Sequence, residues 1–195
     1  MIQKWNDYGT HKTADFERLP KGGYIFKILN VETGFWEDNR QYIKLGCDII
    51  EGDYAKFFEQ AYRANPSEDK RWGCYFFINI PVNDGSERDN WTKSAFENAI
   101  YALEDSNSGF HWDWNETKLK GLTVGGLVNE REYEKQDGSI GTATNFAKFV
   151  SVDKIRSGKF TIPKDKMLKK QSAPAMGEGF MQIPEGLDDK GLPFN

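Results

Sequence analysis

The sequence contains little cysteine, little histidine and no long run of apolar residues, and each shortage excludes a class of protein. Its two cysteines, Cys47 and Cys74, are too few for a disulfide scaffold or a four-cysteine zinc site, so we expect two reduced, buried thiols. No stretch approaches the roughly 18 to 20 consecutive apolar residues of a membrane span. Residues 1–20 also lack the apolar core of a signal peptide. We therefore expect a protein that stays in the cytoplasm and does not bind a membrane.

Motifs of common catalytic sites are also missing. The chain has no Gly-x-Ser-x-Gly elbow, no Gly-x-x-x-x-Gly-Lys-Ser/Thr phosphate loop and no Gly-x-Gly-x-x-Gly turn after a strand. Its two histidines, His11 and His111, leave a zinc site short of its usual ligands. We expect a binding protein with no catalytic residues, no cofactor and no metal. The segment FHWDWNE, with His111, Asp113 and Glu116, keeps a metal-dependent nuclease open as an alternative.

Acidic charge is concentrated near the C-terminus. The net charge is −4, of which residues 171–195 carry −3, from four acids and one lysine, and residues 1–170 carry −1. A nearly neutral body can still bind phosphate through a local basic stripe. Residues 171–195 are rich in small residues and lack hydrophobic periodicity, which is typical of a disordered tail. We therefore expect one folded domain with an N-terminal arm over residues 1–170 and a flexible acidic tail over residues 171–195.

Strands should dominate the folded part of the chain. Aromatic residues make up 14% of the sequence and are accompanied by 19 glycines, a combination that favours strands and tight turns. Alternation and turn residues predict five strands. They fall in residues 21–33, 41–52, 71–80, 121–134 and 142–155. The inward-facing set would be Ile43, Leu45, Cys47 and Ile49 in the second strand, and Trp72, Cys74, Phe76, Ile78 and Ile80 in the third.

One helix is expected between the third and fourth strands. The residues Phe96, Ala99, Ile100 and Leu103 have helical spacing, and Ser94 and Glu97 stand at capping-box spacing. Residues 53–70 fit either a short helix or a long loop. Three strands, a helix and two strands is the element order of the OB-fold, although other barrels and α+β sheets share it. The predicted fold is mainly β, a five-stranded OB-fold-like barrel with one helix between strands three and four and a disordered C-terminal tail.

The outward-facing residues of the second and third strands mix aromatic rings with cations. This mixture is typical of single-stranded nucleic-acid binding, because rings stack on bases at roughly 1 to 3 kcal/mol each while Lys and Arg contact phosphates. The last hairpin supplies a smaller second set. The predicted nucleic-acid-binding residues are Trp36, Arg40, Tyr42, Lys44, Arg71, Tyr75, Phe77, Tyr133 and Lys148.

Two alternatives involve the same kinds of side chain. Tyr75 and Phe77 could instead pack beneath residues 51–70 or in a subunit interface. A carbohydrate-binding module is the other alternative, with sugar rings stacked on tryptophan. The rings concerned would be Trp36, Trp72 or Trp112.

The final residues, GLDDKGLPFN, join two acids to an apolar Leu-Pro-Phe. This ending resembles the acidic C-terminal tip of bacterial single-stranded DNA-binding proteins, in which aspartates precede a hydrophobic residue, Pro and Phe. The matching residues are Asp188, Asp189, Leu192, Pro193 and Phe194. In that family the tip docks into pockets of replication, recombination and repair proteins. The resemblance implies that these residues recruit such partners.

The body of the chain carries a second resemblance. The segments LPKGGYIFKILNVE, YIKLGCDIIEGDY and GGLVNEREYEKQDGSI are similar to phage-encoded OB-fold single-stranded DNA-binding proteins, across roughly residues 19–165. This implies a non-catalytic protein of phage replication or recombination that coats exposed DNA strands in the bacterial host cytoplasm. Such binders usually use two or more barrels, so we expect a homo-oligomer. The preference between DNA and RNA stays open.

Overall fold

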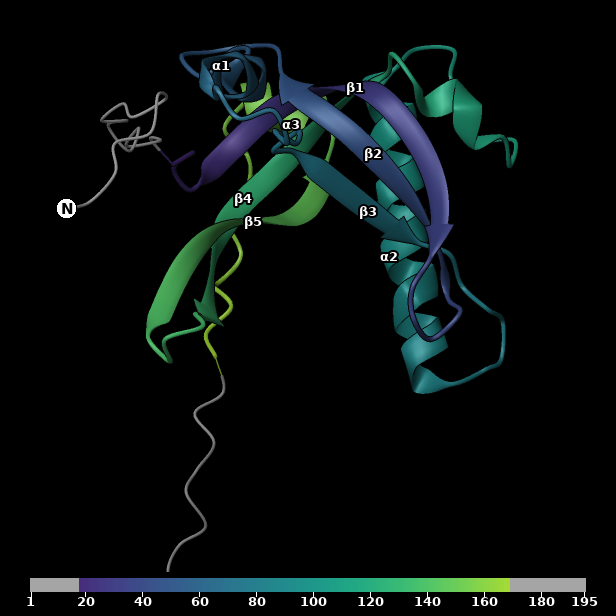
Figure 1. Ribbon diagram of the computed structural model, residues 1–195. Coiled ribbons are helices and arrows are strands. Elements are labelled where there is room, and N and C mark those ends of the chain that lie inside the picture. Colours follow the sequence, from purple (N-terminus) through teal and green to yellow (C-terminus); the bar gives the residue numbers. More distant parts are fainter. Residues whose placement is uncertain (1–17, 169–195) are drawn as a thin grey trace, which may run out of the picture.

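The structure, a computed structural model, describes residues 18–168. Five strands form one antiparallel sheet with the order β3-β2-β1-β4-β5 (Figure 1). The strands are β1 (Gly22–Phe35), β2 (Gln41–Ile49), β3 (Tyr75–Asn79), β4 (Thr123–Glu134) and β5 (Ile140–Val150). The tail expected over residues 171–195, with the tip residues Asp188, Asp189, Leu192, Pro193 and Phe194, lies outside the described residues.

The mainly β fold with one helix between the third and fourth strands is confirmed. β1 is the central strand, because Phe26 lies opposite Ile49 of β2 on one side and Val124 of β4 on the other. Within residues 18–168 no ladder of hydrogen bonds joins β3 to β5, so the OB-like sheet stays open at this edge. Side chains bridge the opening instead, since the ring of Phe76 stacks on that of Phe146 with centroids 3.7 Å apart.

The alternation of β2 and β3 predicts the core correctly. All four inward residues of β2 are at most 1% exposed, and Cys74, Phe76 and Ile78 are also buried. Trp72 and Ile80, predicted with them, are partly buried and pack against this core. Burying such side chains stabilises the fold by roughly 1.5 to 3 kcal/mol each. The third strand begins at Tyr75 rather than Arg71, because the indole Nε1 of Trp72 donates to the Cys47 carbonyl, 2.8 Å away, and occupies the acceptor that a longer ladder would need.

Helix α2 (Glu87–Ser106) packs against β3, β4 and β5. Its predicted apolar face is confirmed, with Phe96, Ala99, Ile100 and Leu103 buried. The predicted start is wrong. The N-cap is Ser86, whose hydroxyl accepts the Asp89 N–H at 3.1 Å, so Ser94 and Glu97 lie inside the helix instead of capping it. An N-cap satisfies a backbone N–H that has no partner within the helix, and Ser86 does this two turns earlier than expected.

Three shorter helical segments complete the described part of the chain. α1 (Phe57–Ala64) resolves the open question at residues 53–70, and a buried carboxylate explains it: Asp48 accepts the N–H groups of Phe58 and Glu59 in the first turn, at 3.1 and 3.0 Å. A 3-10 turn, η1, spans Glu116–Leu119. α3 (Val152–Arg156) replaces the end of the expected fifth strand, where the Val152 N–H donates to Ser106 Oγ at 3.0 Å. Of the helices within residues 18–168, none combines the length and apolarity needed to cross a membrane.

A β-bulge interrupts the pairing of β4 with β5 beside Gly126. Leu127 lies opposite Lys148 and Val128 opposite Phe146, so Ala147 is an extra residue in β5. Gly126 is needed beside it, since a Cβ there would lie 2.5 Å from the Phe146 ring and 2.7 Å from the Phe26 ring. Gly126 of β4 therefore makes room for the ring of Phe146, which bridges β5 and β3.

Candidate functional site

Three aromatic side chains meet on the outer face of the first three strands. Trp36 follows β1, Tyr42 is the second residue of β2, and Phe77 lies in the middle of β3. Ring centroids are 4.4 Å apart for Trp36 and Tyr42, 5.2 Å for Trp36 and Phe77, and 5.3 Å for Tyr42 and Phe77. We call these residues the aromatic cluster. The sequence predicted all three, and the structure brings them together.

The aromatic cluster is held in place but remains accessible. The Nε1 of Trp36 donates to Asn79 Oδ1 at 2.8 Å, which fixes the indole over β3. Phe77 is 41% exposed and Trp36 is 37% exposed. Residues 51–70 do not cover this surface, since α1 packs against β2 at Asp48. Rings that are already ordered and partly exposed lose little entropy when a flat ligand stacks on them.

Lys44 and Tyr75 extend this surface along β2 and β3. The Lys44 Nζ lies 4.1 Å from the centroid of the Tyr75 ring, in a cation–π contact. The same Nζ lies 3.1 Å from Glu32 Oε2 on β1. Lys44 therefore sits where the sequence predicted, beside a ring that is 37% exposed, but an acid offsets its charge.

Arg40 is also paired with an acid. Its Nε donates to Asp38 Oδ2 at 2.7 Å, and this hydrogen bond lowers the pKa of the Asp38 carboxyl. The predicted cations of the outer face thus add little net positive charge. On this face the aromatic rings, rather than the cations, are the features that a ligand would meet.

Two predicted residues stand apart from the aromatic cluster. Arg71 precedes the shortened β3, in an exposed position before the strand. Tyr133 lies near the end of β4 opposite Gly141, and its ring covers that glycine closely, because a Cβ at Gly141 would lie 2.7 Å from it. In the part of the chain that the structure describes, neither residue contacts a ring of the cluster.

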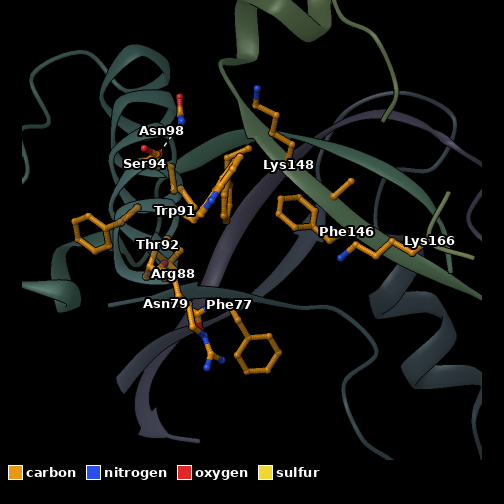
Figure 2. Close-up of a pocket in the computed structure, with 16 residues that line it drawn as sticks. Phe77, Asn79, Arg88, Trp91, Thr92, Ser94, Asn98, Phe146, Lys148 and Lys166 are labelled. Carbon is orange, nitrogen blue, oxygen red and sulfur yellow. Dashed lines mark hydrogen bonds between the residues drawn. The ribbon is translucent and has the colours of Figure 1, made fainter. Parts of the chain in front are cut away.

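A groove of about 650 Å³ lies beside the aromatic cluster, between β3, α2 and β5 (Figure 2). We call it the α2 groove. β3 contributes Phe77 and Asn79, so the groove begins where the cluster ends. The other residues used below are Arg88 and Trp91 from α2, Phe146 and Lys148 from β5, and Lys166. The structure therefore places the predicted Lys148 in a second area that adjoins the first.

The α2 groove differs from the outer face in its charge. Of the described residues that line it, Arg88, Lys148 and Lys166 are cations and none is an acid. The nearest carboxylate to Arg88 is that of Asp38, outside the lining, at 3.7 Å from Nη2. Trp91 adds a large aromatic ring that is 72% exposed. In a chain with a net charge of −4, this is a local positive surface suited to an anion that carries a flat ring.

The sequence interpretation missed Arg88, Trp91 and Lys166. The first two stand three residues apart and share a face of α2, a signal that became visible only once the helix was known to begin at Glu87. Lys166 lies in a segment without periodicity. It reaches the sheet because its N–H donates to Glu130 O and its carbonyl accepts the Glu132 N–H, both at 2.9 Å. No local pattern in the sequence indicates this pairing.

The residues considered for a metal-dependent nuclease and for a carbohydrate-binding module, apart from Trp36, lie outside the aromatic cluster. The Asp113 carboxylate pairs with Lys118 Nζ at 2.5 Å, which lowers the pKa of Asp113, and His111 Nδ1 lies 3.9 Å from Glu104 Oε1. Within residues 18–168, no three His, Cys, Asp or Glu side chains are grouped so as to hold a metal ion. Trp72 packs near Tyr62 and Trp112 near Phe96, away from Trp36.

Comparisons of the sequence with known proteins add no assignment. No family model matches the chain, and no curated protein matches it either.

Proposed function

We propose that this protein binds single-stranded nucleic acid, with DNA as the first candidate, and that it does so without catalysis. The observation that carries the proposal is the aromatic cluster of Trp36, Tyr42 and Phe77 on the outer face of an OB-like sheet. The corresponding face of strands two and three, with its adjoining loops, commonly binds oligonucleotides in OB-folds. Stacking on such rings tolerates any base, because every base has a π-face.

A single strand fits this surface better than a duplex. The bases of a duplex are stacked on one another and cannot present their faces to a protein ring. The outer face also carries little net charge, because Lys44 and Arg40 are paired with Glu32 and Asp38. Duplex binding without base contacts depends on unpaired cations that neutralise phosphates. Stacking should therefore contribute most of the affinity at the aromatic cluster.

The wider biological role rests on the two sequence resemblances. We propose a coating protein of phage replication or recombination that acts in the cytoplasm of the bacterial host, as a homo-oligomer. The residues proposed to recruit replication or recombination proteins are Asp188, Asp189, Leu192, Pro193 and Phe194. Pull-down of such a partner should fail when Phe194 is replaced by Ala, if this part of the proposal holds.

The first experiment titrates fluorescently labelled oligo-dT, a matched duplex and a matched RNA with the full chain at two salt concentrations. Anisotropy reports binding, and quenching of tryptophan fluorescence reports stacking. We expect tight binding to the single DNA strand, with quenching, and much weaker binding to the duplex. Equal affinity for duplex, or no binding at low salt, would refute the proposal. Preference for RNA would change the substrate and keep the mode of binding.

Two further measurements separate the other candidate functions. Binding to soluble polysaccharides with no dependence on salt would favour the carbohydrate-binding module. Shortening of the labelled strand after incubation with magnesium or manganese would favour the nuclease.

A further inference from the structure

We propose that the α2 groove is a second nucleotide subsite, in which a base stacks on Trp91 and phosphates contact Arg88, Lys148 and Lys166. This inference rests on the proposed function, since it extends the path of the same single strand. The strand would leave the aromatic cluster at Phe77, cross β3 and enter the groove. The site would then cover two sides of β3 instead of the outer face alone.

Continuity between the two areas supports this path. Phe77 belongs both to the aromatic cluster and to the wall of the α2 groove. Asn79, two residues along the same strand, lines the groove while its Oδ1 accepts the Trp36 indole N–H. A nucleic-acid strand stacked on the cluster can therefore reach the groove by crossing β3, whose own side chains line both areas.

The side chains of the α2 groove match the parts of a nucleotide. Figure 2 shows Trp91 and Arg88 on the helix, and Lys148 and Lys166 on the opposite side. The cations thus come from two walls, as contacts along a phosphate backbone require, and the exposed indole offers a stacking face between them. Thr92, Ser94 and Asn98 add polar groups that can hydrogen-bond to base edges. The volume of about 650 Å³ lies within the range that encloses a ligand of nucleotide size.

The walls of the α2 groove are anchored before any ligand arrives. Asp89, buried in the first turn of α2, accepts the N–H groups of Val82 and Asn83 at 2.9 and 3.0 Å and pairs with Lys93 Nζ at 2.9 Å. This ties the start of the helix, and Trp91 with it, to the segment that follows β3. On the other wall, Phe146 is held by its stack on Phe76. Anchored side chains reduce the entropy lost on binding.

Charge separates the contribution of the groove from that of the cluster. The cations beside the cluster, Lys44 and Arg40, are paired with Glu32 and Asp38. In the α2 groove Arg88 lies near the same Asp38, but within residues 18–168 Lys148 and Lys166 form no ion pair. For single strands, each phosphate contact adds about 0.7 to the slope of log affinity against log salt concentration. Most of the salt dependence of binding should therefore come from the groove. The aromatic cluster should instead contribute stacking energy that does not depend on salt.

Two exposed tryptophans provide a matched pair of variants for the test. Trp91 is 72% exposed inside the groove, and Trp114 is 75% exposed outside it. With Trp91→Ala we expect affinity for long oligo-dT to fall about 5- to 100-fold, the range for one lost base stack, and the number of nucleotides covered per protein to decrease. Trp114→Ala should leave both quantities unchanged. Circular dichroism and urea unfolding check that both variants fold.

A pair of lysine variants tests the phosphate contacts. Lys148→Gln should lower the salt slope by about 0.7, while Lys120→Gln, which removes an exposed charge outside the groove, should leave it as in the wild type. If the wild type binds and Trp36→Ala weakens binding, but Trp91→Ala and Lys148→Gln behave as their controls do, the second subsite is refuted and the proposed function stands. If the wild type does not bind single strands at all, the proposed function itself fails.

Discussion

The rings of Phe76 in β3 and Phe146 in β5 are stacked, with centroids 3.7 Å apart and planes inclined by 21°. Phe26 of β1 meets both rings edge-on, at 4.8 and 6.3 Å. Side-chain packing at this point joins two strands that share no backbone ladder. The contact also shapes the α2 groove, because Phe146 is one of its walls.

Gly126 should be essential to this packing. In Gly126→Ala the new Cβ would lie 2.5 Å from the Phe146 ring and 2.7 Å from the Phe26 ring, so both must move. Overpacking of this kind costs about 1 to 3 kcal/mol in the free energy of unfolding, which urea denaturation measures. Gly46→Ala is the control, since the nearest atom to its Cβ is 3.5 Å away. Equal stability of the two variants would show that the Phe146 and Phe26 rings can move apart at little cost in free energy, which would contradict the prediction.

Phe77→Ala should weaken binding of single-stranded DNA and reduce tryptophan quenching. The ring contacts Trp36 and Tyr42 and is partly exposed, so its loss removes a stacking face and loosens the rings beside it. We expect a loss of about 5- to 100-fold in affinity. Tyr101→Ala removes an exposed ring on α2 that lines neither the cluster nor the α2 groove, and should bind as the wild type does. A comparable loss in both variants would argue for nonspecific contacts.

Ionisation of Tyr24 should lower the free energy of unfolding at high pH. Burial, and next the neighbouring Tyr54, raise the pKa of the Tyr24 hydroxyl to about 12, and this hydroxyl donates to Pro20 O at 2.8 Å. A tyrosine in the unfolded chain has a pKa of about 10. Between these two pKa values the folded protein therefore holds more protons than the unfolded chain. The free energy of unfolding falls as pH rises through this window. In Tyr24→Phe this part of the decline should vanish, and parallel pH curves for variant and wild type would contradict the prediction.

Cys47 and Cys74 should not react while the protein is folded. The side chains are 0% and 4% exposed, and burial raises the pKa of both thiols well above the usual range. A thiol reagent needs both access and a thiolate. We expect no labelling of native protein at neutral pH within minutes, and labelling of both thiols in denaturant. Rapid labelling without denaturant would indicate that β2 and β3 separate frequently.

The core and the aromatic cluster could be predicted because each follows from a period of two. In β2 and β3, one buried face fixes the phase of every side chain, so placing Ile43 and Phe76 inward also places Tyr42 and Phe77 outward. Trp36 could be predicted to lie beside these residues because the connection between β1 and β2 is short. These are local rules, and they hold wherever one face of a strand is covered.

The α2 groove could not be predicted in the same way. Its cations, Arg88, Lys148 and Lys166, come from parts of the sequence far apart, and only the packing of α2 beside an open sheet edge brings them together. The start of the helix was misplaced because Ser94 and Glu97 have the spacing of a capping box, whereas the hydroxyl that caps the helix is that of Ser86. Arg71 was misplaced because an indole, which no strand rule considers, ends the β3 ladder.

The open side of the sheet also bears on solubility. β3 and β5 are both edge strands, and edge strands present unpaired backbone groups to which a strand of another molecule can add. Proteins avoid this by keeping edges short and by placing lysine on them, and here β3 has 5 residues while β5 carries Lys148. Lys148, one of the side chains proposed to hold a phosphate backbone, therefore also discourages aggregation, so a more hydrophobic residue at position 148 would increase aggregation even in the absence of nucleic acid.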